Sequence, residues 1–400
     1  IEGVKPMAGV IKLESDPRIT VLALSWRDIK APKAGGAEIH THEMLSRADH
    51  KKIRIIHFSP LFDSASPDET IDGVRYLRQG NIFSVISAAH AFYRANRDRI
   101  DFVIDQCNTH RFFTPFWVPQ EKRIFYIHQL TREIWDIQAT FPVSTLGKHL
   151  ETPMLRMNRN DRAIITVSES TKKDLVAVGF PAERITIVPN ALSRDTRACA
   201  QNIPKKVTPA TFIYVGRFAH YKGIDAAIEA LGIVKKTYPD ARLWCVGKKD
   251  DTYIANTLHP ICERYGLTEG APESNADVIY WGFVSDAQKM QLQGQAKALL
   301  FPSVREGWGI IVLEAGIMNT PSIVYDAPGC RDAVDNGKTG YLCRENTPQE
   351  LARLMSQILD NPSEYASMQK VARDFSKQFS WDKSAKIFTD LILNLGKGSV

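Results

Sequence analysis

Short apolar runs alternate with amphipathic stretches through the first half of the chain. Several runs are apolar almost without a break, as expected for parallel strands that are buried on both faces. They predict strands at residues 18–25, 52–58, 101–105, 123–127, 162–167 and 184–189. Apolar positions at helical spacing predict helices at residues 36–48, 83–96 and 168–179. For the last helix, Ser168 or Ser170 is the candidate N-cap and Gly179 the stop signal.

The same alternation starts again after a polar, irregular stretch at residues 193–210, which we interpret as a linker. The second set of apolar runs predicts strands at residues 211–216, 242–247, 277–282, 298–303 and 321–326. Helical patterns follow at residues 223–238, 310–318, 348–377 and 381–395. This order predicts an α/β protein with two doubly wound, Rossmann-like parallel sheets that face each other. Because ligands of such sheets bind at the carboxyl ends of the strands, the residues after each strand are the candidates for chemistry.

The composition is typical of a soluble globular protein, with 44% hydrophobic and 24% charged residues among 400. A net charge of +6, from 51 basic and 45 acidic residues, favours anionic partners in general and does not indicate nucleic acid. The basic residues of segment 47–54 form either a solvated face or a contact with an anionic membrane surface, and the sequence leaves both interpretations open.

The cysteines, the hydropathy and the N-terminal segment all bear on the cellular compartment of the protein. Six cysteines are scattered without a C-x-x-C pair or a nearby histidine at metal-ligand spacing, which favours a reducing environment over disulfides or a zinc site. No apolar run approaches the roughly 18 residues of a membrane span. Residues 1–18 carry charges throughout and lack the apolar core of a signal peptide. We therefore expect a cytoplasmic protein.

The segment SVREGWGIIVLEAG, residues 303–316, places two carboxylates on either side of a glycine-rich turn. Gly307 and Gly309 permit a tight turn before the predicted helix, and amide groups at a helix N-terminus attract phosphate. Glu306 then lies at the edge of the site, and Glu314 lies about a turn and a half into the helix. One carboxylate can face a reacting group while the other holds a hydroxyl pair such as that of a ribose. The structural alternative is that Glu306 caps the turn and Glu314 is a surface residue.

Two cations follow the strand that ends at Gly216. Arg217 lies on the connecting loop, and Lys222 lies at the start of the next helix. Together with helix amides they can neutralise a diphosphate, arginine through a forked contact and lysine as a point charge. The structural alternative is an ordinary surface pair. The spacing G-x-x-x-x-G-K-[ST] is absent, so Lys222 is not a P-loop lysine.

A long loop after the first strand ends in Gly35 and Gly36 at a helix start. Paired glycines let the backbone approach a ligand closely, although a tight connection between strand and helix explains them equally well. The loop has no G-x-G-x-x-G motif, which argues against a dinucleotide cofactor. Trp26, Arg27 and Asp28 precede the glycines, where they can contact an acceptor.

His128 directly follows the strand predicted at residues 123–127 and so lies at a carboxyl end. A histidine at this position can hydrogen-bond a sugar hydroxyl or act in proton transfer. A structural role with both ring nitrogens satisfied is the alternative.

Taken together, these segments resemble the retaining nucleotide-sugar glycosyltransferases of family 4, which have the GT-B architecture. The motifs that carry the resemblance are GGAE at 35–38, VSEST at 167–171, VPN at 188–190, VGRF with KG at 215–223, the E-x7-E motif at 306–314 and PGCRDAVDNGKTGYL at 328–342. The sequence departs from the family at Ala191 and Leu192, where many members have G-V-D. It departs again at Cys330, Arg331 and Asp332, where many members read G-G-x-x-E.

The resemblance implies a role for each candidate residue. It places Glu306 beside the transferred sugar and Glu314 on the nucleotide ribose. It assigns Arg217 and Lys222 to the donor diphosphate, with the amides near Gly309 and Ile310 completing the cradle. It makes Gly35 and Gly36 part of a loop that closes over the phosphates, and it makes His128 the histidine that contacts the donor sugar.

The resemblance also implies an architecture. An acceptor-side domain is expected at residues 1–197, a donor-side domain at 198–380, and a C-terminal helix at 381–400 that crosses back to the first domain. Domain closure is expected to expel water from the site.

The implied reaction is the transfer of a sugar from a UDP- or GDP-type donor to an acceptor hydroxyl, with retention of configuration, in glycan or glycoconjugate biosynthesis. No metal or other cofactor is expected, because two cations and a helix dipole stabilise the leaving group and no D-x-D motif follows a strand. The acceptor is a glycan, a lipid-linked substrate, a protein or a small molecule, and peripheral contact with the inner membrane face stays open. A sugar-nucleotide epimerase of the same fold and a non-catalytic nucleotide-sugar-binding subunit are the alternatives.

Overall fold

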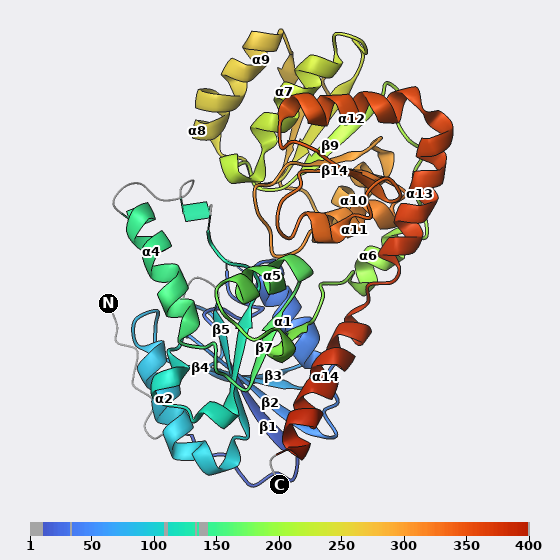
Figure 1. Cartoon of the computed structure of the whole chain (residues 1–400). Helices are drawn as coiled ribbons and strands as arrows, with labels where there is room; N and C mark the ends of the chain where they lie inside the picture. The colour runs from blue at the N-terminus through green and yellow to red at the C-terminus, as the bar shows by residue number, and fades with distance from the viewer. Residues whose placement is uncertain (1–10, 33, 108–110, 133, 136–142, 399–400) are drawn as a thin grey trace.

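The computed structural model describes residues 11–32, 34–107, 111–132, 134–135 and 143–398. Two parallel sheets with their helices lie one above the other (Figure 1). This confirms the prediction of two doubly wound α/β units. The first ten residues of the charged N-terminal stretch lie outside the described residues.

The first sheet has the strand order β3-β4-β2-β1-β5-β6-β7-β8, and all neighbours pair in parallel except β3 with β4. Its strands are β1 (Ile19–Leu24), β2 (Ile53–Ser59), β3 (Asp68–Ile71), β4 (Val74–Arg78), β5 (Phe102–Cys107), β6 (Arg123–Ile127), β7 (Ala163–Thr166) and β8 (Ile185–Ile187). All six predicted strands are confirmed. The hairpin of β3 and β4 was missed because β3 is a short polar edge strand, and its turn at Asp72 and Gly73 has positive φ angles.

The second sheet has the order β11-β12-β10-β9-β13-β14-β15 and is parallel throughout. Its strands are β9 (Thr211–Val215), β10 (Arg242–Val246), β11 (Glu269–Gly270), β12 (Val278–Gly282), β13 (Leu299–Phe301), β14 (Ser322–Val324) and β15 (Gly340–Leu342). The five predicted strands are confirmed. The two edge strands β11 and β15 are too short to give an apolar run in the sequence.

The helices cover both sheets. Those that precede the second sheet are α1 (Gly36–Ser46), α2 (Val85–Asn96), α4 (Val143–Arg156), α5 (Glu169–Ala177) and α6 (Arg194–Cys199). The later ones are α7 (Ile224–Val234), α8 (Asp251–Tyr253), α9 (His259–Tyr265), α10 (Asp286–Gln295), α11 (Ile310–Ile317), α12 (Pro348–Asp360), α13 (Pro362–Ser376) and α14 (Trp381–Lys397). Of the two candidate caps of α5, Ser168 accepts the hydrogen bond from the Thr171 amide.

Two predictions about these helices need correction. The stretch expected to be an irregular linker contains α6, whose N-cap Ser193 accepts a hydrogen bond from the Thr196 amide. The single helix expected at residues 348–377 is two helices, α12 and α13. Pro362 has no amide hydrogen to continue α12 and instead lies in the first turn of α13.

The C-terminal helix α14 packs on the first sheet, although it follows the last helix of the second sheet in the chain (Figure 1). Phe388 and Ile392 are fully buried in the core that contains β1, β2 and β6. Leu192 and Ser380 bridge the two segments that run between the sheets. The boundaries at residues 197 and 380 stay predictions. Among the described residues, no helix is both long and apolar enough to cross a bilayer.

Candidate functional site

Each sheet reverses its strand order beside its first strand. In the first sheet β1 lies between β2 and β5, and in the second β9 lies between β10 and β13. The loops that follow the strands on either side of such a point diverge and leave a crevice at the carboxyl ends. The crevice of the second sheet is flanked by the loop that carries Arg217 and Lys222 and by the loop that carries Glu306.

The carboxyl edges of the two sheets meet. A Cβ atom placed on Gly307 would lie 3.1 Å from the carbonyl oxygen of His128, and one on Gly36 would lie 3.8 Å from Ile310 Cδ1. The Ser170 amide donates to Asp332 Oδ1 across the same junction at 3.0 Å. The structure therefore brings together the predicted residues of both domains at one place, which we call the junction site.

Lys222 and Glu306 form an ion pair at the centre of the junction site. Lys222 Nζ donates to Glu306 Oε1 at 2.5 Å, and both side chains are largely buried. Burial lowers the pKa of Lys222, but the carboxylate of Glu306 opposes it and the pKa ends above its ordinary value. The lysine is therefore charged at neutral pH. Arg217 is exposed and donates to the hydroxyl of Tyr221, so both predicted cations stand around one tyrosine.

The loop of Glu306 is held by the segment that departs from the family pattern. The Glu306 amide donates to the Pro328 carbonyl at 3.0 Å. Gly329 has a φ of 78°, and a Cβ there would lie 1.9 Å from the Glu306 carbonyl oxygen. Only glycine fits this approach. Asp332 also accepts the Gly329 amide at 3.1 Å, so its carboxylate joins this loop to α5 of the other domain.

Glu314 is not a surface residue. Its exposed fraction is 7%, and Lys289 on α10 donates to Oε1 at 3.0 Å and lies 2.9 Å from Oε2. Burial raises the pKa of Glu314, and the ammonium group of Lys289 opposes this effect. Sequence reasoning missed Lys289. The available signal was its place in the first turn of the helix after β12, near a carboxyl end.

Two helices begin at the junction site. Gly309 is the N-cap of α11, and Gly35 is the N-cap of α1, where the Gly35 amide donates to Glu38 Oε2 at 2.7 Å. Neither Gly35 nor Gly36 has a positive φ, and the contact at Gly36 leaves room for a methyl group. The backbone does not require glycine at these two positions, so a strained turn does not explain them, and the close approach of a ligand stays a prediction. The positive ends of both helix dipoles favour an anion between them.

His128 lies at the end of β6, where Tyr126 OH and His128 Nε2 are hydrogen-bonded at 2.9 Å. Its Nδ1 is buried and has no hydrogen-bond partner among the described residues. Burial, and then the neighbouring His40, hold the pKa of His128 well below its ordinary value. The structural alternative, in which both ring nitrogens are satisfied, is thus not met among the described residues.

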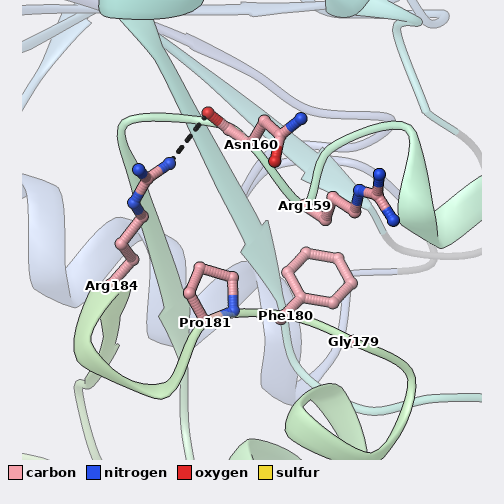
Figure 2. A pocket seen from close by; sticks show the side chains of 6 residues that line it. All are labelled: Arg159, Asn160, Gly179, Phe180, Pro181 and Arg184. Atoms are coloured by element: carbon pink, nitrogen blue, oxygen red, sulfur yellow. Dashed lines mark hydrogen bonds between the residues drawn. The ribbon is translucent and has the colours of Figure 1, made fainter.

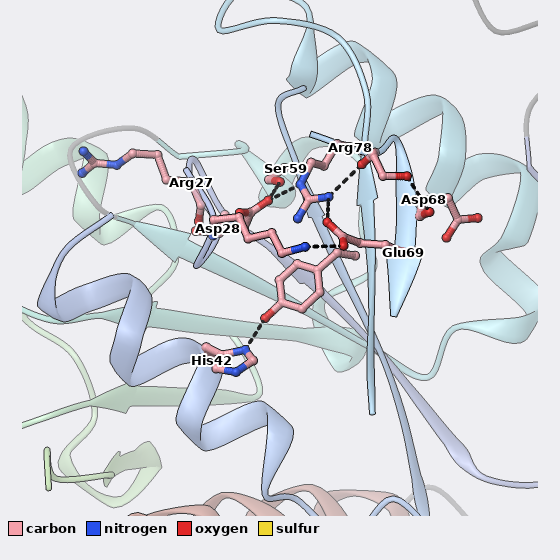
Figure 3. Close-up of polar contacts among 11 residues, drawn as sticks. Arg27, Asp28, His42, Ser59, Asp68, Glu69 and Arg78 are labelled. Atoms are coloured by element: carbon pink, nitrogen blue, oxygen red, sulfur yellow. Dashed lines mark hydrogen bonds and ion pairs between the residues drawn. The ribbon is translucent and has the colours of Figure 1, made fainter. Parts of the chain in front are cut away.

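Two of the residues expected to contact an acceptor, Asp28 and Arg27, bond to other side chains of the protein. Asp28 is 1% exposed, and its Oδ2 accepts from Arg78 Nε at 2.5 Å and from the Ser59 hydroxyl at 3.1 Å (Figure 3). Asp28 is therefore not available to an acceptor. Arg27 points away from this cluster (Figure 3). Its Nε lies 3.1 Å from Glu38 Oε1, in the first turn of α1.

A depression outside the junction site is no candidate for the same chemistry. This hollow has a volume of about 430 Å³. The residues that line it, Arg159, Asn160, Gly179, Phe180, Pro181 and Arg184, are drawn in Figure 2. These residues precede β7 and β8, so the hollow lies at the amino edge of the first sheet, opposite the junction site.

Comparison with known proteins fits this geometry. The model of Glycosyltransferase Family 4 matches residues 34–195, and the model of Glycosyl transferases group 1 matches residues 195–375. The chain belongs to the family 4, group 1 glycosyltransferases. The junction site of this family 4 glycosyltransferase lies where residues of both matched regions meet.

Curated relatives of this family 4 glycosyltransferase are distant. A glycogen synthase of Mycobacterium tuberculosis is 25% identical over 242 residues, which is 60% of this chain and 56% of the relative. A D-inositol 3-phosphate glycosyltransferase of Corynebacterium aurimucosum is 24% identical over 285 residues, which is 64% of this chain and 66% of the relative. The chain thus spans less than two thirds of the length of these relatives.

Solved structures establish the GT-B fold. A sucrose-phosphate synthase from Thermosynechococcus elongatus matches with a TM-score of 0.73 at 18% identity, over 96% of this chain and 100% of that one. HepE from Anabaena, in complex with UDP and glucose, matches with a TM-score of 0.65 at 15% identity, over 94% and 99%. At these identities the likeness shows the fold alone.

Proposed function

We propose that the chain is a retaining glycosyltransferase, which moves a sugar from a nucleoside diphosphate sugar to an acceptor hydroxyl. The observation that carries the proposal is the ion pair of Lys222 and Glu306, which lies at the junction of the two domains beside the N-terminus of α11. A cation, a carboxylate and a helix dipole at one point suit a substrate that has both a diphosphate and a reacting sugar.

In this reaction the bond between the sugar carbon and the diphosphate oxygen breaks, and the nucleoside diphosphate leaves with the electron pair. The acceptor oxygen bonds to the same carbon from the same face and passes its proton to an oxygen of the departing diphosphate. Arg217 and Lys222 stabilise the charge that develops on the diphosphate, together with the first amides of α11 at Gly309 and Ile310. Glu314 holds the ribose hydroxyls, and Glu306 lies beside the transferred sugar. We propose that no metal is required, because these groups supply the positive charge.

The choice of nucleotide and acceptor to test first rests on the similar proteins. Likeness to a structure solved with UDP and glucose makes a uridine nucleotide the first donor to test, and a guanosine nucleotide the second. The relatives named for glycogen synthesis and for inositol phosphate glycosylation support an acceptor in glycan or glycoconjugate biosynthesis. We further propose that the protein acts at the cytoplasmic side of the membrane, with peripheral contact that sedimentation with anionic vesicles at low salt will test.

The decisive experiment is thermal unfolding with UDP, GDP, ADP and TDP and their sugars, followed by turnover with and without acceptors. A ligand at about 100 times its dissociation constant adds roughly 2.7 kcal/mol to the free energy of unfolding. We expect one nucleotide to stabilise the parent but neither Lys222→Met nor Glu314→Gln. Lys386→Met is the matched control, because Lys386 is an exposed lysine that pairs with Asp390 on the solvent side of α14.

The other results of these experiments contradict the proposed function or favour one of its alternatives. Stabilisation by no nucleotide contradicts the donor site. Conversion of the donor without an acceptor indicates an epimerase, and binding without turnover over a broad acceptor panel indicates a binding subunit. Loss of turnover in the presence of a chelator contradicts the metal-free mechanism.

A further inference from the structure

A chain of three side chains, two of them completely buried, runs from the backbone at the end of one strand to the junction site. His40 on α1 lies with Nε2 at 2.9 Å from the Val188 carbonyl oxygen. The hydroxyl of Tyr126 on β6 contacts His40 Nδ1 on one side and lies 2.9 Å from His128 Nε2 on the other. His40 and Tyr126 are completely buried, so no water competes for these contacts.

The direction of each hydrogen bond in this chain can be worked out from one end. A carbonyl oxygen only accepts, so the proton of His40 is on Nε2 and its Nδ1 is an acceptor. Tyr126 must then donate its single proton to His40 Nδ1 and accept from His128 Nε2. A neutral His128 with its proton on Nε2 has a bare lone pair on Nδ1.

The titration behaviour of the three groups is consistent with this arrangement. Burial lowers the pKa of His40 to about 4 and raises the pKa of Tyr126 well above its ordinary value. His128 is held neutral as well, first by burial and then by the neighbouring His40. All three groups are therefore neutral over the physiological range of pH.

Among the described residues, the tautomer with the proton on Nε2 leaves only His128 Nδ1 of this chain unpartnered, whereas the opposite tautomer leaves two buried polar groups unpartnered. With the proton on Nδ1, His128 Nε2 becomes an acceptor that competes with His40 Nδ1 for the one proton of Tyr126. One of these two buried acceptors then has no donor. If the proton of His40 also moves, from Nε2 to Nδ1, the Val188 carbonyl loses its donor instead. An unsatisfied buried polar group is costly, so the chain fixes a single tautomer.

We propose that Tyr126 and His40 are positioning residues that hold His128 with a bare Nδ1, which accepts a hydrogen bond from a hydroxyl group of the bound sugar. This inference rests on the proposed function, because the hydroxyl belongs to a sugar substrate. The Nδ1 atom is the unpartnered, buried nitrogen of a side chain that lies against Gly307, next to Glu306. A hydroxyl is the donor that a sugar offers there.

The first test is nuclear magnetic resonance of the protein labelled with ¹⁵N-histidine, which reports the tautomer of each ring without any substrate. We expect His128 with its proton on Nε2 at neutral pH, and a mixture of tautomers in Tyr126→Phe. Tyr76→Phe is the matched control. Tyr76 is also buried, and its hydroxyl lies 2.8 Å from another α1 histidine, His42. This control should leave the His128 signal unchanged.

The second test is steady-state kinetics once the donor is known. We expect kcat/KM to fall about three- to tenfold in Tyr126→Phe, as for the loss of one neutral hydrogen bond, with unchanged affinity for the free nucleoside diphosphate. His40→Gln should retain most activity, because a glutamine amide can donate to Val188 and accept from Tyr126. His40→Leu should not retain it.

The outcomes separate this proposal from the assigned activity. A parent protein with the His128 proton on Nδ1 overturns the proposal, and this measurement needs no variant to fold. An unchanged tautomer in Tyr126→Phe overturns it too. If the tautomers are as expected but no nucleotide sugar binds, the proposed function fails and the role of Nδ1 toward a sugar fails with it.

Discussion

Two acidic side chains of the junction site are each paired with a lysine, Glu306 with Lys222 and Glu314 with Lys289. Buried ion pairs add little net stability, because the cost of removing both charges from water offsets their attraction. Stability therefore does not explain the two pairs, which are consistent with the roles proposed for both carboxylates toward a ligand. In Glu314 burial favours the neutral acid and Lys289 favours the carboxylate, and the pKa ends above its ordinary value.

Replacement of Lys289 by methionine should make nucleotide affinity depend on pH over a higher range. Burial already holds the pKa of Glu314 above its ordinary value, so the carboxylate that we propose accepts the ribose hydroxyls is lost as the pH falls through that raised pKa. Without Lys289 the pKa rises further, and affinity starts to fall at a higher pH. Titration calorimetry with the nucleoside diphosphate over weakly acidic to neutral pH measures this shift. Lys289→Arg, which keeps the charge, is the control, and equal pH profiles in all three proteins contradict the interpretation.

At the scale of the element, the site depends on how α11 and the loop before it are held. Helix α11 has the apolar sequence IIVLEAGI, and most of its residues are buried. Glu314 is its one ionisable residue. The loop at Gly329 is pressed against the backbone of Glu306 and joined to α5 through Asp332. The position of Glu306 is thus set by a segment more than twenty residues later in the sequence, on the far side of α11 and β14.

Gly329→Ala should destabilise the second domain by about 2–4 kcal/mol, because the new methyl group meets backbone and the left-handed conformation is strained. Gly337→Ala is a close control. Gly337 has the same φ of 78°, yet nothing lies within 4 Å of its added Cβ, so we expect a loss of about 1 kcal/mol. Chemical denaturation of both variants gives the comparison. Equal losses show that the close approach to Glu306 is unimportant.

At the scale of the whole molecule, the chain joins the two sheets twice. The segments near Leu192 and Ser380 run side by side, and α14 then returns to complete the core of the first sheet. Two adjacent crossings restrict how the domains move relative to one another, as expected for a hinge. The contacts of Gly36 with Ile310 and of Ser170 with Asp332 close the junction on the side of the site.

Phe388→Ala in α14 should therefore weaken the first domain rather than the second. Phe388 is completely buried against that sheet, and a loss of about 3–5 kcal/mol is expected. Leu354→Ala in α12 is the reciprocal control, since Leu354 lies in the core of the second sheet. Hydrogen exchange resolved by segment shows which domain opens first. Faster exchange in β9 and β10 of Phe388→Ala contradicts this division.

Much of this architecture and of the site was predictable from the sequence. Buried parallel strands are continuous apolar runs, so eleven of the fifteen strands were predicted. Three of the four missed strands, β3, β11 and β15, are short edge strands, and the fourth, β4, has arginines within its sequence VRYLR that interrupt an apolar run. The motifs around Arg217, Lys222, Glu306 and Glu314 identified the second-domain half of the site, because local glycines and strand ends mark it.

The sequence by itself determined the two sheets, the carboxyl-end positions of the candidate residues and the family they resemble, since each depends on local pattern. Only the tertiary structure decided which charges pair. Lys289 meets Glu314, Asp332 joins two domains, and Arg78 removes Asp28 from the acceptor side. The chain of His40, Tyr126 and His128 joins residues 86 positions apart. Such contacts depend on how helices and loops from distant parts of the chain pack at one edge, and no local pattern encodes that.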